Sequence, residues 1–296
     1  LALVWFIMAS VVVLIAAPGS GAISAEVVAA LRDHGAGNFH WLSPGDAAEV
    51  DFFPRLGEFL IGVRSLPIDA AVVSTENRRK RLLVADMDST MIHQECIDEL
   101  GMMAGSGGLI KDITARAMRG ELDFEGALKA RVALLRGLDQ SVIRQVIRER
   151  ITFMPGGKVL IATMKANGAY TALLSGGFTA FTSHVAGVLG FDEHRANTLV
   201  IANGKLTGTV TEPILGQEAK RQSLLEIAVL RSLDAADAIA VGDGANDVAM
   251  LMEAGLGVAL HAKPHVQESS MLRINHADLT ALLYLQGYRK DQFVGA

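Results

Sequence analysis

Short apolar runs alternate with amphipathic stretches along the first quarter of the chain. Runs rich in β-branched residues predict strands, and apolar positions three or four residues apart predict helices. The predicted elements, in order, are strand Val11–Ala16, a helix from Ala25 to about His34, strands Phe39–Leu42 and Ala48–Phe52, helix Pro54–Val63 and strand Ile68–Val73. Ser24 is the predicted N-cap of the first helix. This β-α-β-β-α-β order is typical of split βαβ modules and carries no catalytic pattern.

From Leu82 onward, runs typical of buried strands recur between helical stretches. The runs are Leu82–Ala85, Tyr170–Leu174, Ala238–Val241 and Leu256–Leu260, and the helical stretches are Gly157–Asn167, Thr179–Leu189, Gln217–Ser232 and Asp247–Ala254. Strands that alternate with helices of this length pair in parallel through right-handed crossovers. Residues 96–150 show helical periodicity and no strand, so we expect a helical insertion over the carboxyl ends of the strands, where such sheets bind ligands. The predicted fold class is therefore α/β, a parallel-sheet core with a helical cap.

These changes of pattern divide the chain into four parts. We expect an N-terminal domain at 1–75, within which 1–10 form an extension of unassigned structure, then a linker at 76–81, a core at 82–95 and 151–296, and a cap at 96–150. The linker reads Glu76-Asn77-Arg78-Arg79-Lys80-Arg81. For so short a charged run, a solvated linker is favoured over a basic contact patch.

The first seventeen residues have two interpretations. They are apolar apart from Ser10 and end before Pro18-Gly19-Ser20. Seventeen residues are at the short limit for a membrane-spanning helix, and a secretory signal needs a basic start, whereas the first Lys or Arg is Arg32. The β-branched run Val11–Ile15 before a Pro-Gly turn favours a buried strand. A targeting or anchoring segment is the alternative, and cell fractionation would distinguish the two.

Composition narrows the class of protein. Half of the 296 residues are hydrophobic and 20% are charged, which suits a sizeable core and excludes a disordered chain. A formal charge of −5 gives no attraction for nucleic acid or anionic lipid. The single cysteine, Cys96, excludes an internal disulfide framework and a Cys-based zinc site. We expect a cytoplasmic protein that binds a small molecule, with no nucleic-acid or membrane partner, and a homodimer stays open.

The strongest chemical signal is Asp86-Met87-Asp88-Ser89-Thr90, directly after the first core strand. Both carboxylates would be anionic at neutral pH and would repel each other, so the pair needs a nearby cation or a proton. Asp243 and Asp247, within Gly242-Asp243-Gly244-Ala245-Asn246-Asp247, follow another strand and add carboxylates at the same sheet edge. Several carboxylates in an all-oxygen ligand set favour Mg²⁺. Solvated loop aspartates, with Asp247 as a helix cap, are the alternative.

Two further segments suit phosphate binding. Ser175-Gly176-Gly177 closes the third strand before a helix, where a hydroxyl and backbone N–H groups can hold an anion. Lys220 lies in the first turn of another predicted helix, where a cation opposes the helix dipole, and this indicates an anionic partner. Taken singly, a serine helix cap and a solvated lysine would explain them.

The ordered set, Asp-x-Asp, Ser-Gly-Gly, Lys and Gly-Asp-Gly-x-Asn-Asp, resembles the haloacid dehalogenase (HAD) superfamily of phosphotransferases. Residues 86–100, 118–124, 131–135 and 282–289 look like the phosphoserine phosphatase family of bacteria within it. The resemblance covers about residues 68–296, and the N-terminal domain more loosely, as an ACT-like regulatory α+β fold. It implies a Rossmann-like, HAD-type core and Mg²⁺ as cofactor. The implied reaction is hydrolysis of O-phospho-L-serine through an aspartyl-phosphate, the last step of serine biosynthesis.

Carried over motif by motif, the resemblance assigns roles to individual residues. Asp86 would be the nucleophile and Asp88 the general acid/base. The implied metal ligands are Asp86, Asp88 through its backbone carbonyl, Asp243 and Asp247. The implied substrate-binding residues are Glu95, Met118, Phe124, Arg131, Ser175, Gly176, Lys220 and Asn246. Arg131 and Glu95 suit the carboxylate and ammonium of an amino acid, whereas helical core packing explains Met118 and Phe124 equally well. Cys96 is expected to be a small buried residue beside the site.

Two departures and two rival functions stay open. His93 stands where the family has a small residue, so it either alters the hinge into the cap or points to solvent. Residues 266–272 look less regular than the C-terminal segment of family members, so the boundary of the helix there is not predicted. The rivals are a phosphotransferase for another monoester and an amino-acid sensor with a vestigial enzymatic half. Every motif carboxylate and the lysine are present, which argues against the sensor, and a substrate panel would separate the phosphotransferases.

Overall fold

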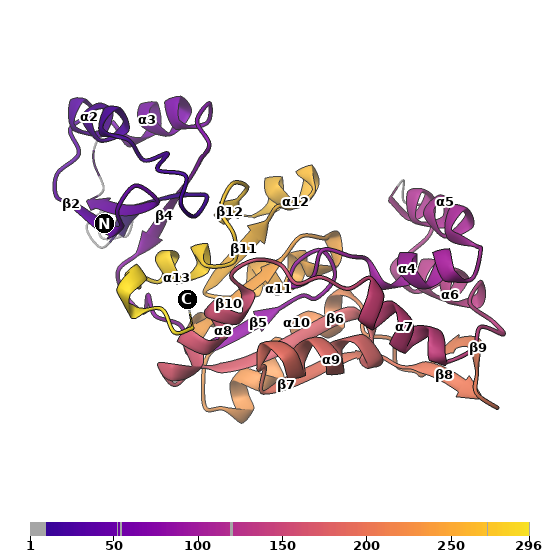
Figure 1. Ribbon diagram of the computed structural model, residues 1–296. Coiled ribbons are helices and arrows are strands. Elements are labelled where there is room, and N and C mark those ends of the chain that lie inside the picture. Colours follow the sequence, from indigo (N-terminus) through magenta and orange to yellow (C-terminus); the bar gives the residue numbers. More distant parts are fainter. Residues whose placement is uncertain (1–9, 52, 54, 119–120, 271, 296) are drawn as a thin grey trace.

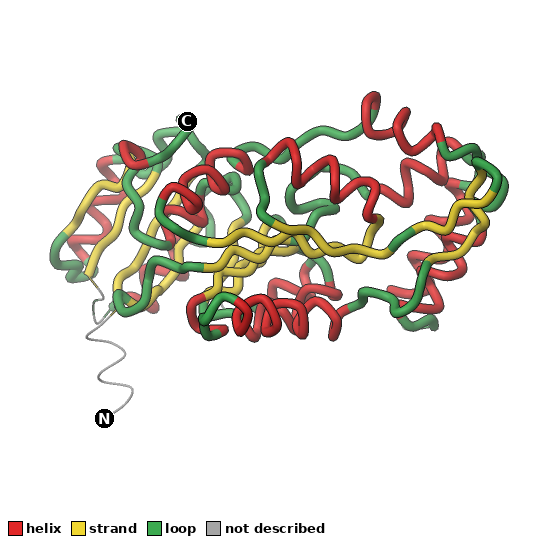
Figure 2. Tube along the Cα trace, turned by 90° about the horizontal axis from the view of Figure 1, so that it is seen from below, coloured by secondary structure: helices red, strands yellow, loops and turns green. Residues whose placement is uncertain are grey.

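The computed structural model describes residues 10–51, 53, 55–118, 121–270 and 272–295. Three parts follow one another in space (Figures 1 and 2): a small N-terminal unit, a sheet with helices on both faces, and a group of helices at the opposite end. Among the described residues, no helix has both the length and the apolar character needed to span a membrane.

The N-terminal unit has the predicted order of elements. They are β1 (Ser10–Ala16), α2 (Ala25–Asp33), β2 (Phe39–Ser43), β3 (Ala47–Asp51), α3 (Leu56–Val63) and β4 (Ile68–Ser74). The strands form an antiparallel sheet in the order β2-β3-β1-β4, and the side chain of Ser24 caps α2 as predicted. All of β1 is buried because both of its faces are covered: Val12 and Leu14 pack in one cluster with residues of α2 and α3, and the alternate side chains pack in the main core cluster. The strand interpretation is therefore confirmed for residues 10–16, while 1–9, Phe52 and Pro54 lie outside the described residues.

The core is a six-stranded parallel sheet. Its strands are β5 (Leu82–Ala85), β6 (Tyr170–Phe178), β7 (Glu193–Asn197), β10 (Ala238–Gly242), β11 (Leu256–Leu260) and β12 (Leu272–Ile274). Their order is β12-β11-β10-β5-β6-β7. The four predicted strands are confirmed. Two strands were not predicted from the sequence: β7, which is an edge strand of mostly polar residues, and β12, which has only three residues.

Helices cover both faces of this sheet. They are α8 (Gly157–Ala166), α9 (Thr179–Leu189), α10 (Gln217–Leu230), α11 (Val248–Glu253), α12 (Pro264–Ser269) and α13 (Ala281–Leu285). Because side chains alternate along a strand, Leu82 and Val84 pack in one cluster with residues of α10 and α11, whereas Leu83 and Ala85 pack in the other with α8 and α9. A 3₁₀ turn at Ala245–Asp247 precedes α11, and the irregular 266–272 segment holds the end of α12 and the start of β12.

Four helices occupy the predicted insertion, namely α4 (Cys96–Met103), α5 (Gly107–Met118), α6 (Phe124–Ala133) and α7 (Ser141–Glu149). A β-hairpin lies against them. It consists of β8 (Leu199–Ala202) and β9 (Lys205–Val210) and was not predicted from the sequence. Leu206 N–H donates to Leu138 O at 2.9 Å, and Gly137 N–H donates to Leu206 O at 2.8 Å. The cap is thus bonded to the core through this hairpin as well as through its own two ends.

The charged run at 76–81 is not a solvated linker throughout, and that expectation is wrong for two of its residues. Arg78 pairs with Glu49 at 2.7 Å and donates to Leu285 O at 2.9 Å, near the end of α13. The buried Lys80 donates to Ala236 O at 2.7 Å. The run passes between the N-terminal unit and the core, where its cations bond backbone carbonyl groups and a carboxylate.

A second polar contact joins these two parts. The buried carboxylate of Asp69, on β4, accepts the backbone N–H groups of Asn275, His276 and Ala277 at 2.7, 3.0 and 3.1 Å. This segment directly follows β12, so the N-terminal unit is bonded to the edge of the core sheet.

Candidate active site

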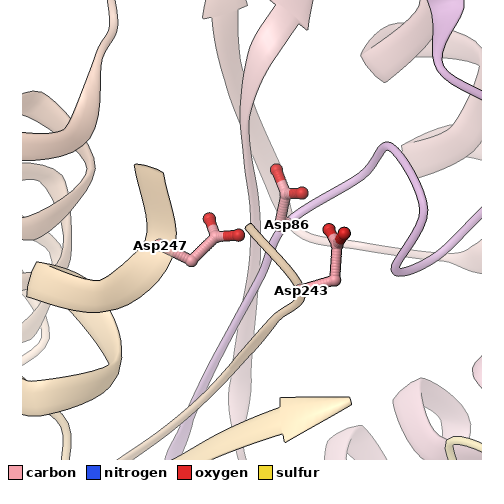
Figure 3. Close-up of side chains that lie close together, drawn as sticks. All are labelled: Asp86, Asp243 and Asp247. Carbon is pink, nitrogen blue, oxygen red and sulfur yellow. The ribbon is translucent and has the colours of Figure 1, made fainter. Parts of the chain in front are cut away.

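Three carboxylates meet at the carboxyl edge of the parallel sheet. Asp86 directly follows β5, Asp243 follows the neighbouring β10, and Asp247 ends the 3₁₀ turn beyond it. Figure 3 shows the three side chains turned toward one another. One oxygen from each lies within 4.8 Å of the others, and all three residues are buried. The predicted convergence of these motifs is therefore confirmed.

Lys220, in the first turn of α10, is fully buried against this cluster. Its Nζ lies 2.5 Å from Asp86 Oδ1 and 2.7 Å from Asp247 Oδ1. These two partners explain why a lysine is tolerated at the positive end of a helix dipole. Lys220 bonds two of the three carboxylates, and the cluster keeps excess negative charge, which is costly in a buried site. A set of hard oxygen donors at this spacing fits a divalent cation.

The pKa values of these groups follow from burial and mutual repulsion. Burial, and next the charge of Asp247, raise the pKa of Asp86 well above its ordinary value. Burial raises the pKa of Asp243 to about 6. Burial works against the charge of Lys220, but Asp247 and Asp86 together raise the pKa of its ammonium. Lys220 therefore stays protonated, and a bound cation would let the carboxylates stay ionised.

Asp88 lies beside the cluster in a different environment. Its Oδ1 accepts the N–H of Cys96, at the start of α4, at 3.2 Å. Burial, and next the charge of Glu95, raise the pKa of Asp88 to about 7. A carboxyl group that titrates near neutrality can both give and take a proton. A Cβ on Gly177 would lie 2.6 Å from Asp88 Oδ2, so only glycine fits there.

The serine-glycine motif closes its strand just before a helix, as predicted, but the strand extends beyond the expected end at Leu174. Strand β6 continues through Ser175 to Phe178, because Phe178 still pairs with Asn197 of β7. The hydroxyl oxygen of the buried Ser175 accepts the N–H of Gly177 at 2.9 Å. Asn246 Nδ2 lies 3.7 Å from the position of a Cβ on Gly176. The structure thus brings these motif residues to one place.

Phe124, the first residue of α6, reaches from the cap to the same place. A Cβ on Gly176 would lie 3.0 Å from its ring, and one on Gly216 would lie 3.1 Å from it. Phe124 also packs against the main core cluster. Its side chain therefore both packs in the core and lies beside the glycines of the candidate site. Met118 is the last residue of α5, and its side chain lies outside what the structure describes.

The cap also supplies charged groups near Asp88. Arg131, in the last turn of α6, donates to Ala127 O at 3.2 Å and to Thr114 Oγ1 at 3.4 Å. Burial lowers the pKa of Arg131, and the charges of Glu95, Asp98 and Asp88 act in the opposite direction. Glu95 accepts the hydroxyl of Ser89 at 2.9 Å. A cation of the cap and an anion just before its first helix therefore lie near the catalytic candidates.

Two residues near Asp243 were missed from the sequence. Lys263 Nζ lies 3.7 Å from Asp243 Oδ2, and the hydroxyl of the buried Thr90 lies 3.5 Å from Oδ1. The available signal for Lys263 was its place just beyond the carboxyl end of another core strand, β11.

The two remaining sequence questions concern His93 and Cys96. The side chain of His93 is exposed, so the solvent alternative holds, while its N–H donates to Thr152 O at 3.0 Å where the cap joins the core. Cys96 is buried as expected, and burial raises the pKa of its thiol, which disfavours a reactive thiolate.

Comparison with known proteins agrees with this geometry. Residues 83–252 match the family described as haloacid dehalogenase-like hydrolase. The phosphoserine phosphatase of Haemophilus influenzae is 42% identical over 240 residues, which are 81% of this chain and 69% of that protein. A HAD family hydrolase from Salmonella enterica serovar Typhi superposes with a TM-score of 0.84 at 28% identity, over 94% of this chain and 98% of the other. A probable phosphoserine phosphatase from Vibrio cholerae gives 0.80 at 32% identity, over 97% and 89%.

Proposed function

The chain belongs to the haloacid dehalogenase-like hydrolases, and from this premise we propose that it hydrolyses O-phospho-L-serine to L-serine and phosphate. One observation carries the proposal. Asp86 and Asp88 follow the same strand, one in a buried carboxylate–lysine cluster and the other near Glu95 and the cap residue Arg131. The first environment suits a phosphoryl group, and the second suits the ammonium and carboxylate of an amino acid.

In the first half-reaction, an Asp86 oxygen attacks phosphorus and the bond from phosphorus to the seryl oxygen breaks. Asp88 transfers its proton to that oxygen, and L-serine leaves. A pKa of about 7 keeps about half of Asp88 protonated at neutral pH. In this proposal Lys220, Ser175 and Asn246 hold the phosphoryl oxygens, whose charge must be balanced in the transition state.

In the second half-reaction, the ionised Asp88 takes a proton from water, whose oxygen attacks the phosphorus of the aspartyl-phosphate. The bond between phosphorus and Asp86 breaks, phosphate leaves, and both residues return to their first state. The cap over the site excludes bulk water while the intermediate exists.

We propose Mg²⁺ as the divalent cation, held by Asp86, Asp243, Asp247 and the backbone carbonyl of Asp88. When bound, it would neutralise charge on the carboxylates and on the phosphoryl oxygens. The donor chemistry supports this choice, because Mg²⁺ needs few protein ligands and prefers carboxylate oxygens.

The test is phosphate release by the full chain with Mg²⁺, compared across L-phosphoserine, phosphothreonine, glycerol phosphate and p-nitrophenyl phosphate. We expect the highest kcat/KM for L-phosphoserine. A preference for a monoester without an amino-acid group would contradict the assigned substrate. The chain would then be a phosphotransferase that acts on a different monoester. The ACT-like regulatory role of the N-terminal unit, the cytoplasmic location and a homodimer remain predictions for ligand binding, fractionation and light scattering.

A further inference from the structure

Asn197, the last residue of β7, is a buried polar residue outside every motif considered so far. Its side chain is 2% exposed and makes three hydrogen bonds. Nδ2 donates to Gly176 O at 2.9 Å and to Leu215 O at 3.3 Å, and Oδ1 accepts Leu215 N–H at 2.7 Å. A buried amide with its donors and acceptor satisfied fixes the groups that it bonds, because leaving them unpaired is costly.

The contact with Gly176 reaches Ser175 through one peptide group. The carbonyl of Gly176 and the N–H of Gly177 belong to the same planar unit and point in opposite directions. Asn197 holds the carbonyl, and the N–H at the other end donates to Ser175 Oγ. With its oxygen held as an acceptor, the serine hydroxyl has its own proton to donate to a phosphoryl oxygen.

The contacts with Leu215 reach Lys220 through the start of α10. Asn197 bonds both the N–H and the carbonyl of Leu215, so this residue's backbone is fixed at both ends. Gly216 follows directly, and its carbonyl accepts the N–H of Lys220 at 3.0 Å. The position of the lysine that pairs with Asp86 therefore depends on where Asn197 holds Leu215.

The two segments that Asn197 joins are also the two that contact Phe124. The ring lies so close to Gly176 and Gly216 that a Cβ on either would crowd it. The spacing between the segments therefore sets both the phosphoryl contacts and the place where the cap meets the core.

We propose that Asn197 is a positioning residue for phosphoryl transfer, which fixes Ser175 relative to Lys220 so that both converge on the transferring group. This inference rests on the proposed phosphatase function. Asn197 acts through two backbone segments and bonds none of the charged cap residues assigned to the amino-acid end. Its loss should therefore weaken transition-state stabilisation more than the binding of phosphoserine.

The test uses the full chain with Mg²⁺ and the variant Asn197→Ala, with orthovanadate as a phosphoryl analogue. Small misplacements of reacting groups slow the chemical step strongly, so we expect kcat for L-phosphoserine to fall about 100-fold. KM should stay within about threefold, since the amino-acid contacts persist. Calorimetry should show orthovanadate binding at least about tenfold more weakly. Thr198→Ala is the matched control, because the side chain of this exposed neighbour bonds the Thr179 hydroxyl and no motif residue among those described, so it should leave all three values unchanged.

A purely structural role predicts a different pattern. Asn197→Ala would then lower the melting temperature and the active fraction, while the folded protein bound orthovanadate as tightly as the parent, and this result would overturn the inference. If the alanine variant does not fold, Asn197→Ser, which keeps a short donor, should give the same direction with a smaller factor. If the parent releases no phosphate from L-phosphoserine, the proposed substrate fails, and the orthovanadate comparison by itself decides the role of Asn197.

Discussion

Replacing Arg131 by alanine should separate substrate recognition from phosphoryl transfer. Arg131 bonds Ala127 O and Thr114, and within the described residues it forms no ion pair with an acidic side chain. Its half-buried charge is therefore available to a substrate carboxylate, which a guanidinium binds through two parallel hydrogen bonds. L-phosphoserine has that carboxylate, and p-nitrophenyl phosphate does not.

The size of the effect follows from the environment of the guanidinium. Removing one partner of a partly buried charge pair costs on the order of 2–4 kcal/mol. At about 1.36 kcal/mol for each factor of ten, kcat/KM for L-phosphoserine should fall about 30- to 900-fold. Burial lowers the pKa of Arg131, so its charge is incompletely solvated and the upper part of this range is expected. Hydrolysis of p-nitrophenyl phosphate should change by less than about threefold.

The assay is steady-state phosphate release from both substrates, with two control variants. Lys129→Ala removes another cation from α6, one that is exposed and pairs with Glu212 at 2.8 Å. Thr114→Val removes the neighbour that Arg131 bonds without removing the charge. Both controls should retain most activity on both substrates. If Arg131→Ala lowers both activities by the same factor, then Arg131 supports the cap and the recognition argument is refuted.

Four further outcomes are expected. Asp86→Asn should abolish turnover and trapping of a phosphoenzyme while far-UV circular dichroism stays unchanged, and activity within about tenfold of the parent would contradict the nucleophile assignment. Because the proton of Asp88 is present below its pKa of about 7 and lost above it, kcat/KM for L-phosphoserine should fall as pH rises through 7, and Asp88→Asn should remove that limb of the profile. Chelation should stop the reaction and Mg²⁺ should restore it better than Ca²⁺, whose looser coordination allows Asp86 to bind through both oxygens; equal rates with both ions would refute this. Asp69→Ala should lower the free energy of unfolding by about 1–3 kcal/mol in urea titrations, because three backbone N–H groups lose their acceptor, and an unchanged midpoint would show that this contact is dispensable.

Local pattern was sufficient where an element is long or strongly apolar. Strands β5, β10 and β11 are continuous apolar runs, so burial on both faces could be inferred from composition. Strand β7 carries Glu193, His194 and Arg195 at the edge of the sheet, and such a sequence has no strand signal of its own. Its pairing with β6 defines it, and pairing is a non-local property.

The same division applies to the site. The order of Asp86, Ser175, Lys220 and Asp243 along the chain, each near an expected strand or helix end, was enough to predict that they converge, because parallel strands end at one edge. The protonation states in the site could not be predicted. The pKa of Asp88, for example, depends on its burial and on the charge of Glu95.

The sequence by itself determined the apolar strands and the helices between them, the helical insertion and the set of catalytic candidates, because periodicity and short motifs are local. Tertiary structure decided the rest. It turned Arg78 and Lys80 from an expected solvated linker into contacts between two parts of the chain. It also gave Asn197 its importance, because its hydrogen-bond partners lie 18 and 21 residues away along the chain. A polar side chain carries no mark of its partners until the fold brings them within hydrogen-bonding distance and removes the water that would otherwise compete for them.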